Sequence, residues 1–286
     1  MSLPASVSLS ETIPGYAILT VNHATCTARV ALNGAHVMEW TPAGQTPVLY
    51  LSPQAVLEPG KPIRGGIPVC WPWFNAHPTD ATKPMHGIAR NRPWTLMEAS
   101  ESEEGVKLSF VLCSDVGTHE LWPYAFEAHL TVLLGAKLEV SLQTVNKGDC
   151  EFVVAEALHT YLTVGDITQV TVKGLADTDY LDTVGERTVR HQTGDITFDR
   201  EVDRQYVSTG TVTVEDPALG RTVVIEKTGS GTTVVWNPWI EKSKRLADLP
   251  DDAFHGFLCI EAANAGDAAV TVAPGEAHVI QTVISL

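Results

Sequence analysis

The chain has 286 residues, of which 44% are hydrophobic and 19% are charged, and its formal net charge at pH 7 is −15. This composition is typical of a folded globular protein and excludes a disordered chain. The strong negative charge argues against nucleic acid or an anionic membrane surface as a partner. An anionic small molecule is compatible with it, because a binding site needs only a local cluster of arginines.

Four β-hairpins are predicted along the chain. In each of them, two runs of mostly alternating apolar and polar residues flank a turn signal, as expected for strands with one face on a core. The turns are expected at Asn33-Gly34, near Gly135, at 217–220 and at Pro274-Gly275. The hairpins span residues 25–40, 126–148, 210–229 and 269–286.

Helical signals are few and short. Residues 114–122 and 244–249 are each expected to form one or two helical turns. The chain contains no internal repeat, no low-complexity tract and no Ser/Gly-rich linker. We therefore predict one all-β domain over residues 1–286, a large and mostly antiparallel sandwich.

The five cysteines are scattered along the chain and form no CxxC pair, which predicts neither a zinc knuckle nor a disulfide framework. Each lies in an apolar setting, and we expect all five to be reduced and buried: Cys26, Cys70, Cys113, Cys150 and Cys259. The N-terminus lacks a signal-peptide pattern, and no apolar stretch approaches the ~20 residues of a membrane span. We therefore expect a cytoplasmic protein.

The motifs of several familiar chemistries are missing. The chain has no GxGxxG after a strand, no P-loop, no HExxH and no GxSxG. Among the ten histidines the nearest candidates for a shared metal, His77 and His86, are nine residues apart in a loop. We therefore expect no metal site.

Residues 64–94 follow neither a helical nor a strand period, and they combine tryptophans and prolines with histidines and arginines. Arg64, His86 and Arg90 supply positive charge and hydrogen-bond donors, and the tryptophans supply flat apolar surfaces. An ordered loop of this kind often lines a functional site. The alternative is a loop folded onto a sheet face with its tryptophans as a local core. Composition leaves both interpretations open.

The motif EALHTYL contains a histidine in an otherwise apolar strand. Strand alternation puts His159 on the same face as Ala157 and Tyr161, opposite Leu158 and Leu162. A histidine beside a phenol and away from the aliphatic face is a candidate acid–base catalyst. A lone histidine in a strand is also often a satisfied structural group, and the pattern alone does not decide between these roles.

Glu261 directly follows the apolar run 257–260. A carboxylate at the end of a buried strand is unfavourable unless it is paired or used, so Glu261 is either a functional residue or the partner of an arginine. The motif VVWNPWIEKS has a similar character, with Trp236, Trp239 and Glu241 around Pro238. The sequence predicts no role for Glu241 or Lys242.

Five motifs occur in the order RGGIPVCWPWF, HGIARNRPW, EALHTYL, VVWNPWIEKS and CIEAANA. Together they resemble the glucose-6-phosphate 1-epimerases, the hexose-6-phosphate mutarotases of the aldose 1-epimerase superfamily, over residues 64–265. Asn75 and Ile88 depart from the family pattern, which has glycine and phenylalanine there. The resemblance implies a galactose-mutarotase-like β-supersandwich with its active site in a cleft on the concave face of the larger sheet.

The resemblance also implies an enzyme that interconverts the α and β anomers of an aldohexose 6-phosphate, glucose 6-phosphate foremost, without metal or organic cofactor. By motif position, His159 is the general acid and Glu261 the general base, and we expect His159 to be protonated when Glu261 is ionised. His86 would assist at the sugar ring, and Arg64 and Arg90 would hold the phosphate.

The resemblance also makes Asp203 a contact of the sugar hydroxyls. Two rival functions stay open: a sugar-phosphate-binding or sensing protein without catalysis, and a mutarotase of unphosphorylated aldoses. A glycosidase fits less well, because it needs two carboxylates and only Glu261 is well placed, with Asp203 and Glu241 as uncertain seconds. We expect a monomer.

Overall fold

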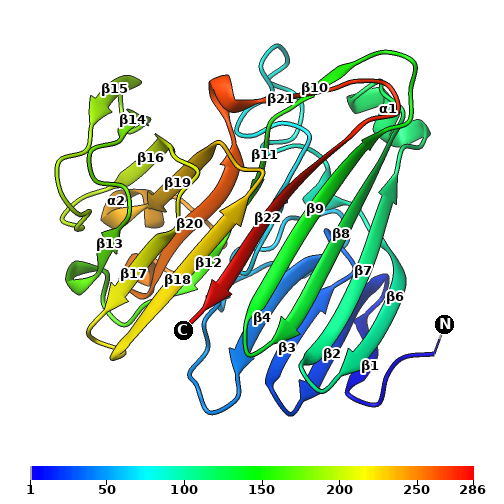
Figure 1. Cartoon of the computed structure of the whole chain (residues 1–286), viewed down its shortest axis with the longest axis horizontal. Coiled ribbons are helices and arrows are strands. Elements are labelled where there is room, and N and C mark those ends of the chain that lie inside the picture. The colour runs from blue at the N-terminus through cyan, green and yellow to red at the C-terminus, as the bar shows by residue number, and fades with distance from the viewer. Residues whose placement is uncertain (1) are drawn as a thin grey trace.

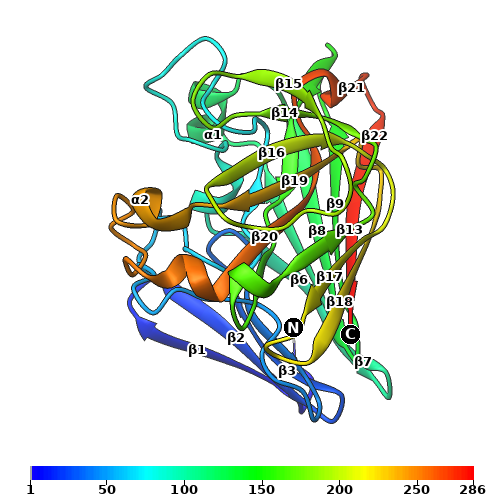
Figure 2. The ribbon, with the colours of Figure 1, turned by 90° about the vertical axis from the view of Figure 1, so that its left-hand side faces the viewer.

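The computed structural model describes residues 2–286, apart from the side chain of Thr12. Two eight-stranded sheets dominate it, accompanied by a four-stranded sheet and a two-stranded ribbon. Figure 1 shows one large sheet running across the molecule, with the N-terminal strands at its lower end. The side view in Figure 2 shows the second large sheet packed in front of the first. This architecture is the β-supersandwich expected from the sequence.

The first large sheet, here called the β9 sheet, has the strand order β13-β17-β18-β22-β9-β8-β7-β6. Its ladders are antiparallel. Its strands are β13 (Thr171–Lys173), β17 (Val212–Asp216), β18 (Arg221–Thr228), β22 (Ala277–Ser285), β9 (Leu138–Asn146), β8 (Phe126–Gly135), β7 (Gly105–Cys113) and β6 (Thr95–Ser102).

The second large sheet, here called the β20 sheet, has the order β15-β14-β16-β19-β20-β11-β5, and β12 also pairs with β20. It too is antiparallel. Its strands are β15 (Thr188–His191), β14 (Asp179–Asp182), β16 (Val202–Val207), β19 (Thr232–Asn237), β20 (Phe257–Asn264), β11 (Glu156–Leu158), β5 (Val69–Cys70) and β12 (Tyr161–Thr163).

The remaining strands form two smaller units. The four-stranded sheet follows chain order: β1 (Val7–Ile13), β2 (Tyr16–His23), β3 (Cys26–Ala31) and β4 (His36–Pro42). The ribbon pairs β10 (Phe152–Val154) with β21 (Val270–Val272). The expected hairpins at residues 25–40, 126–148 and 210–229 are confirmed by the ladders β3–β4, β8–β9 and β17–β18.

Helices are short. The α-helices are α1 (Val116–Leu121) and α2 (Trp239–Ser243), and the 3₁₀ turns are η1 (Ala89–Asn91), η2 (Ile167–Gln169), η3 (Ala253–Gly256) and η4 (Gly266–Ala268). The helix expected at residues 114–122 is confirmed as α1, whose first turn is closed by a capping box between Asp115 and Thr118. Within residues 2–286, no helix is long and apolar enough to cross a membrane.

The expected hairpin at residues 269–286 is wrong. The chain does turn at Pro274-Gly275, but β21 pairs with β10, and β22 lies between β9 and β18 in the β9 sheet. Alternation identified both strands correctly. It carries no information about partners far away in the sequence, and the long ladders offered by β9 and β18 outcompete the three residues of β21.

Two further expectations need correction. The helix expected at 244–249 lies one turn earlier, at α2, because Pro238 precedes it and the Asn237 side chain accepts the Trp239 N–H at 2.9 Å. Cys113 and Cys150 are exposed, whereas the other three cysteines are buried as expected. Cys113 is the last residue of β7, where an apolar neighbour in sequence no longer implies burial.

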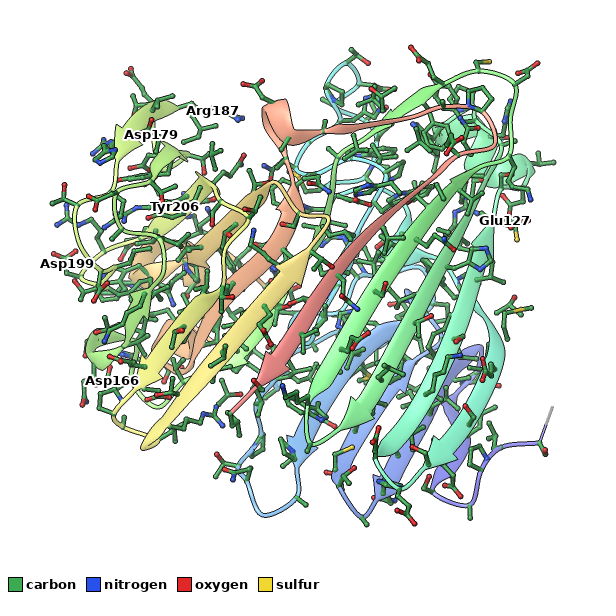
Figure 3. All side chains as sticks on the ribbon, in the orientation of Figure 1. Glu127, Asp166, Asp179, Arg187, Asp199 and Tyr206 are labelled. Atoms are coloured by element: carbon green, nitrogen blue, oxygen red, sulfur yellow. The ribbon has the colours of Figure 1, made fainter. Side chains whose placement is uncertain are left out.

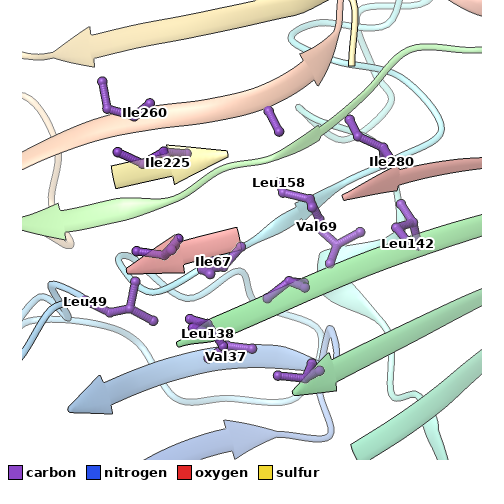
Figure 4. Close-up of a cluster of buried hydrophobic side chains, with 14 of the residues drawn as sticks. Val37, Leu49, Ile67, Val69, Leu138, Leu142, Leu158, Ile225, Ile260 and Ile280 are labelled. Atoms are coloured by element: carbon purple, nitrogen blue, oxygen red, sulfur yellow. The ribbon is translucent and has the colours of Figure 1, made fainter. Parts of the chain in front are cut away.

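A continuous hydrophobic core lies between the sheets and spans residues from Val7 to Ile284. Figure 4 shows part of it, where Leu158 and Ile260 of the β20 sheet belong to the same cluster as Leu142 and Ile280 of the β9 sheet. All four of these side chains are at most 1% exposed. This core supports the single domain predicted over residues 1–286, which stays a prediction.

Candidate active site

Strand β20 is buried along its whole length, so both of its faces are covered. Leu258, Ile260 and Ala262 belong to the core between the sheets. The alternate residues belong to a second cluster on the other face of the β20 sheet, which includes Cys259 and Ala263. Because side chains alternate along a strand, Glu261 projects to this second face.

His159 reaches the same face from the neighbouring strands. It lies at the break between β11 and β12, where its N–H donates to the Pro68 carbonyl at 3.0 Å. Its imidazole stacks on the Tyr161 ring, with centroids 4.8 Å apart and planes inclined by 10°. Leu158 and Leu162 lie in the core on the opposite face. The face assignment expected for EALHTYL is therefore confirmed.

The two proposed acid–base residues approach each other closely. His159 Nε2 lies 3.4 Å from Glu261 Oε1, and the two side chains are 10% and 1% exposed. Within residues 2–286, His159 Nδ1 and Glu261 Oε2 are buried without a hydrogen-bond partner. Buried polar atoms of native proteins are nearly always paired, so such atoms are available to a ligand or to bound water.

Burial opposes charge on both groups. It raises the pKa of Glu261 well above its ordinary value, and the nearby Asp203 raises it further while Arg90 partly opposes this. Burial also lowers the pKa of His159, assisted by His86 and the nearby arginines. Both directions favour the uncharged side chains, with the proton of the pair on Glu261. They run against the expected protonated His159 and ionised Glu261, because desolvation penalises both charges. The protonation of the pair stays a prediction.

His86 belongs to the same cluster. Its ring lies 5.8 Å from that of His159, edge to face, and its Nδ1 accepts the Asn75 N–H at 3.2 Å. Burial and the nearby Arg90 and Arg64 lower the pKa of His86 to about 3, so it is neutral.

The backbone around His86 is unusual, with φ angles of 62° at His86 and 64° at Asn75. A Cβ at Gly87 would come within 1.9 Å of the Trp71 carbonyl oxygen, so only glycine fits there. Asparagine tolerates the left-handed conformation better than most residues, which explains how it replaces the glycine of the family pattern.

Arg64 lies beside the stacked rings. Its Nη1 donates to the Tyr161 hydroxyl at 2.9 Å, and its Nε donates to Asp248 Oδ1 at 3.1 Å. Its side chain is 21% exposed, so it is partly accessible to solvent. The structure thus places Arg64 next to the pair of His159 and Glu261, but already engaged by two side chains.

Arg90 lies on η1, near the end of the loop 64–94. Its Nη2 donates to the Met85 carbonyl at 2.8 Å, and its Nε is buried without a partner in the described part of the chain. Its charge acts on the pKa values of Glu261, His159 and His86. Arg90 is therefore part of the same electrostatic cluster, with an unused donor.

Asp203 reaches the cluster from β16, where it is the register partner of Trp236. Lys242 Nζ lies 3.4 Å from Asp203 Oδ2 and 2.9 Å from Glu201 Oε1. The same ammonium lies 5.9 Å from the centre of the Trp236 ring. Trp236 in turn meets the His159 ring edge to face at 5.9 Å.

The sequence singled out neither Tyr161 nor Asp248 as part of the site and left the role of Lys242 open. The signal for Lys242 was its place in VVWNPWIEKS, and that for Tyr161 its alternation with His159. Glu241, considered as a second carboxylate, is 78% exposed and pairs with Lys244 at 3.0 Å, so it lies outside the cluster. Asp248 gave no signal, because it lies in an irregular segment distant in sequence from Arg64.

The tryptophans of the loop 64–94 do not line the cluster. Trp71, Trp73 and Trp94 are at most 5% exposed and belong to the main core. The local-core interpretation is therefore correct for the tryptophans, whereas Arg64, His86 and Arg90 face the cluster. A surface hollow of about 530 Å³ lies elsewhere, along residues 100–107 and 133–139. The cleft expected at the site stays a prediction.

His159 and Glu261 bring an imidazole and a carboxyl together on one buried face of a β-supersandwich sheet. These two groups are suited to proton transfer, as in an acid–base isomerase. The family model for Aldose 1-epimerase matches residues 17–285. The chain belongs to this family, and it is an isomerase-type enzyme.

A relative from Escherichia coli (strain K12), named "Putative glucose-6-phosphate 1-epimerase", is 37% identical over 268 residues, 93% of this chain and 89% of that protein. The crystal structure of a "putative mutarotase" from Salmonella typhimurium matches with a TM-score of 0.92 at 32% identity, covering 99% of this chain and 94% of that one. A galactose mutarotase related enzyme from Lactobacillus acidophilus shares the fold at 14% identity, with a TM-score of 0.73 over 93% of this chain and 96% of that one.

Proposed function

We propose that this chain interconverts the α and β anomers of aldohexose 6-phosphates, glucose 6-phosphate foremost, by acid–base catalysed opening and closure of the sugar ring. The reaction removes a proton from the C1 hydroxyl and delivers one to the ring oxygen. The open aldehyde then rotates about C1–C2 and closes on its other face, with the proton transfers reversed. The observation that carries this proposal is the 3.4 Å approach of His159 Nε2 to Glu261 Oε1 at a nearly dry site.

His159 is the proposed general acid and Glu261 the proposed general base. The C1 hydroxyl and the ring oxygen are bonded to the same carbon, so two adjacent side chains can reach both atoms. Each such proton transfer typically contributes ~10²- to 10⁴-fold in rate. The buried atoms without partners, Nδ1 of His159 and Oε2 of Glu261, leave hydrogen-bonding capacity for the sugar.

The pair carries one movable proton, and the position of this proton decides the roles. Burial favours the proton on Glu261 in the unliganded protein. A bound C1 hydroxyl that donates to the Glu261 carboxylate stabilises its ionised form, and a nearby phosphate favours a protonated His159. Substrate binding would therefore transfer the proton from Glu261 to His159 before the ring opens.

The phosphate assignment rests on the cations of the cluster. Arg90 has an unused Nε, and Arg64 has Nη2 left after its bonds to Tyr161 and Asp248. Arginines next to the acid–base pair would hold an anionic group despite the net charge of −15. His86 would assist at the sugar ring, and Asp203 would accept hydrogen bonds from sugar hydroxyls.

One observation favours a second candidate, a mutarotase of unphosphorylated aldoses. Asp248 lies 3.1 Å from the Arg64 guanidinium and neutralises part of its charge. A site that binds a phosphate dianion has to weaken this ion pair, whereas a site for a neutral sugar does not.

Exchange NMR at the anomeric protons tests the proposal, with glucose 6-phosphate and glucose as substrates in parallel samples. We expect α–β exchange above the uncatalysed background for both, and a larger kcat/KM for glucose 6-phosphate. Equal acceleration of both sugars would support the second candidate. Absence of acceleration for either would leave a binding or sensing protein.

A further inference from the structure

Tyr161 links two parts of the cluster that have separate roles in the proposed function. Its hydroxyl accepts the hydrogen bond of Arg64 Nη1 at 2.9 Å, and its ring stacks on the His159 imidazole at 4.8 Å. Tyr161 is 2% exposed, so this linkage is shielded from water. The buried side chain of Tyr161 thus contacts both Arg64, which is proposed to bind the phosphate, and His159, the proposed general acid.

Within residues 2–286, the orientation of the His159 ring depends on packing. Nδ1 has no hydrogen-bond partner there, and Nε2 approaches only Glu261, at 3.4 Å. Catalytic imidazoles are usually oriented by a hydrogen bond to the nitrogen that is not used in the reaction. Here Tyr161 covers one face of the ring, and His86 and Trp236 meet it edge to face.

The backbone reinforces the connection. The Tyr161 N–H donates to the Gly66 carbonyl at 2.9 Å, and the His159 N–H donates to the Pro68 carbonyl at 3.0 Å. The segment that begins at Arg64 therefore runs alongside the segment that carries the stacked rings. The side-chain contact and these two backbone contacts thus connect the Arg64 segment to the stacked rings.

We infer that Tyr161 is a positioning residue, which couples occupation of Arg64 by a phosphate to the orientation of His159. This inference rests on the proposed function for its substrate. It gives the phosphate a role in catalysis in addition to binding. A phosphate on Arg64 raises kcat, because it fixes the Tyr161 ring and thereby holds the imidazole in the orientation that protonates the ring oxygen.

Tyr161→Phe tests this coupling, because it keeps the stacking ring and removes only the hydroxyl. We expect kcat for glucose 6-phosphate to fall about tenfold, the effect of losing one hydrogen bond to a charged group, while KM changes much less. The ratio of kcat values for glucose 6-phosphate and glucose should shrink by the same factor. An unchanged ratio would overturn the inference.

Tyr206→Phe is a matched control. Tyr206 lies on β16 in the left part of Figure 3, it is fully buried, and Arg204 Nη1 donates to its hydroxyl at 3.3 Å. The variant Tyr206→Phe therefore also loses a buried hydroxyl next to an arginine, but the ring at this position packs in the main core. We expect kcat and the substrate ratio of this variant to equal those of the wild type; a similar loss would mean that the Tyr161 effect reports stability alone.

A second readout separates the coupling from the proposed function. Inorganic phosphate is titrated into the protein while the imidazole ¹⁵N and ¹H signals of His159 and the ring signals of Tyr161 are followed by NMR. We expect both residues of the wild type to respond with one midpoint, and the His159 response to be largely lost in Tyr161→Phe. This result supports the coupling even if neither sugar is turned over. A His159 response without a Tyr161 response in the wild type, which needs no variant to fold, would overturn it.

Discussion

Two pairs of a histidine and a glutamate lie on opposite faces of the β20 sheet, and they behave differently. On the site face, His159 and Glu261 approach to 3.4 Å. On the core face, Glu156 Oε1 of β11 lies 2.9 Å from His278 Nε2 of β22. In both pairs the glutamate is at most 1% exposed.

The core-face pair is held by hydrogen bonds. Asn264 Nδ2 donates to Glu156 Oε1 at 3.0 Å, and the hydrogen bond to Glu156 raises the pKa of His278. On the site face, burial lowers the pKa of His159 instead, and both partners keep an unpaired buried atom. Glu156 Oε2 also lacks a partner in the described residues. The same two residue types therefore form a structural pair where they are hydrogen-bonded, and a pair suited to proton transfer where they are left open to a ligand.

The largest effect is expected on the rate of anomer exchange when a mutation breaks the site-face pair. His159→Asn should lower the rate of anomer exchange ~10²- to 10⁴-fold, because it removes the proton donor. Since both groups act in one exchange, the double variant His159→Asn with Glu261→Gln should be scarcely slower than the worse single variant. Exchange NMR on all three variants measures this. Multiplicative losses in the double variant would show that the two residues act independently.

The next largest effect is expected on the free energy of unfolding when a mutation breaks the core-face pair. His278→Ala leaves Glu156 buried without its hydrogen-bond partner and should lower the free energy of unfolding by about 3 kcal/mol, with little change in kcat per folded molecule. The pKa of His278 is raised, so its contribution to stability is present below about pH 6.5 and is lost as pH rises through the folded-state value. Urea unfolding at several pH values measures the loss of unfolding free energy and its dependence on pH.

His129→Ala is the control for this prediction. His129 pairs with Glu127 at 3.2 Å on the surface of β8, where the two side chains are 39% and 34% exposed. Glu127 is labelled at the right of Figure 3. We expect this variant to lose less than about 1 kcal/mol. A loss equal to that of His278→Ala, or a loss of kcat in His278→Ala as large as in His159→Asn, would remove the distinction between the two pairs.

A third effect concerns the cations around the site-face pair. Arg64→Ala and Arg90→Ala should each weaken binding of hexose 6-phosphates by roughly 1.5–3 kcal/mol, the range for hydrogen bonds to charged groups. Activity on unphosphorylated glucose should change much less. Titration calorimetry and exchange NMR with both sugars measure the two quantities. Equal losses on both sugars would mean that the arginines support the loop instead of recognising the phosphate.

The smallest effect is on stability at the site itself. The pKa of Glu261 is raised, so its contribution to stability is present below about pH 4.3 and is lost as pH rises through the folded-state value. Glu261→Gln cannot ionise and escapes this loss, so its Tm should exceed that of the wild type by a few °C near neutral pH. The difference should vanish at acidic pH. If the Tm of Glu261→Gln is lower than that of the wild type at every pH, Glu261 is a structural carboxylate.

Much of the fold could be predicted from local signals. The Asn33-Gly34 turn and the alternation around Gly135 sufficed for two hairpins, because register in a hairpin is set by adjacent residues. The partners of β21 and β22 could not be predicted, because they depend on which remote strands have free edges. Helix α2 was missed because its start depends on the side chain of Asn237.

The site could be predicted in part. Alternation correctly placed His159 on the face of Tyr161, and the motifs identified the residues that meet there. The effect of burial on the pKa values of the pair could not be predicted, because burial of Glu261 depends on neighbours from several strands that no local pattern reports. The contact of Asp248 with Arg64 joins residues 184 positions apart in an irregular segment, which has no periodicity to read.

The decisive experiment for the proposed mechanism is the rate of α–β exchange of glucose 6-phosphate catalysed by Glu261→Gln, measured by NMR against the wild type at equal concentrations of folded protein. Gln is nearly isosteric with Glu but accepts no proton, so we predict exchange close to the uncatalysed background together with largely intact binding of the sugar phosphate. A variant that keeps most of the wild-type rate with an intact fold would contradict the mechanism. The base would then have to be sought at Asp203, since Glu241 is exposed and paired with Lys244.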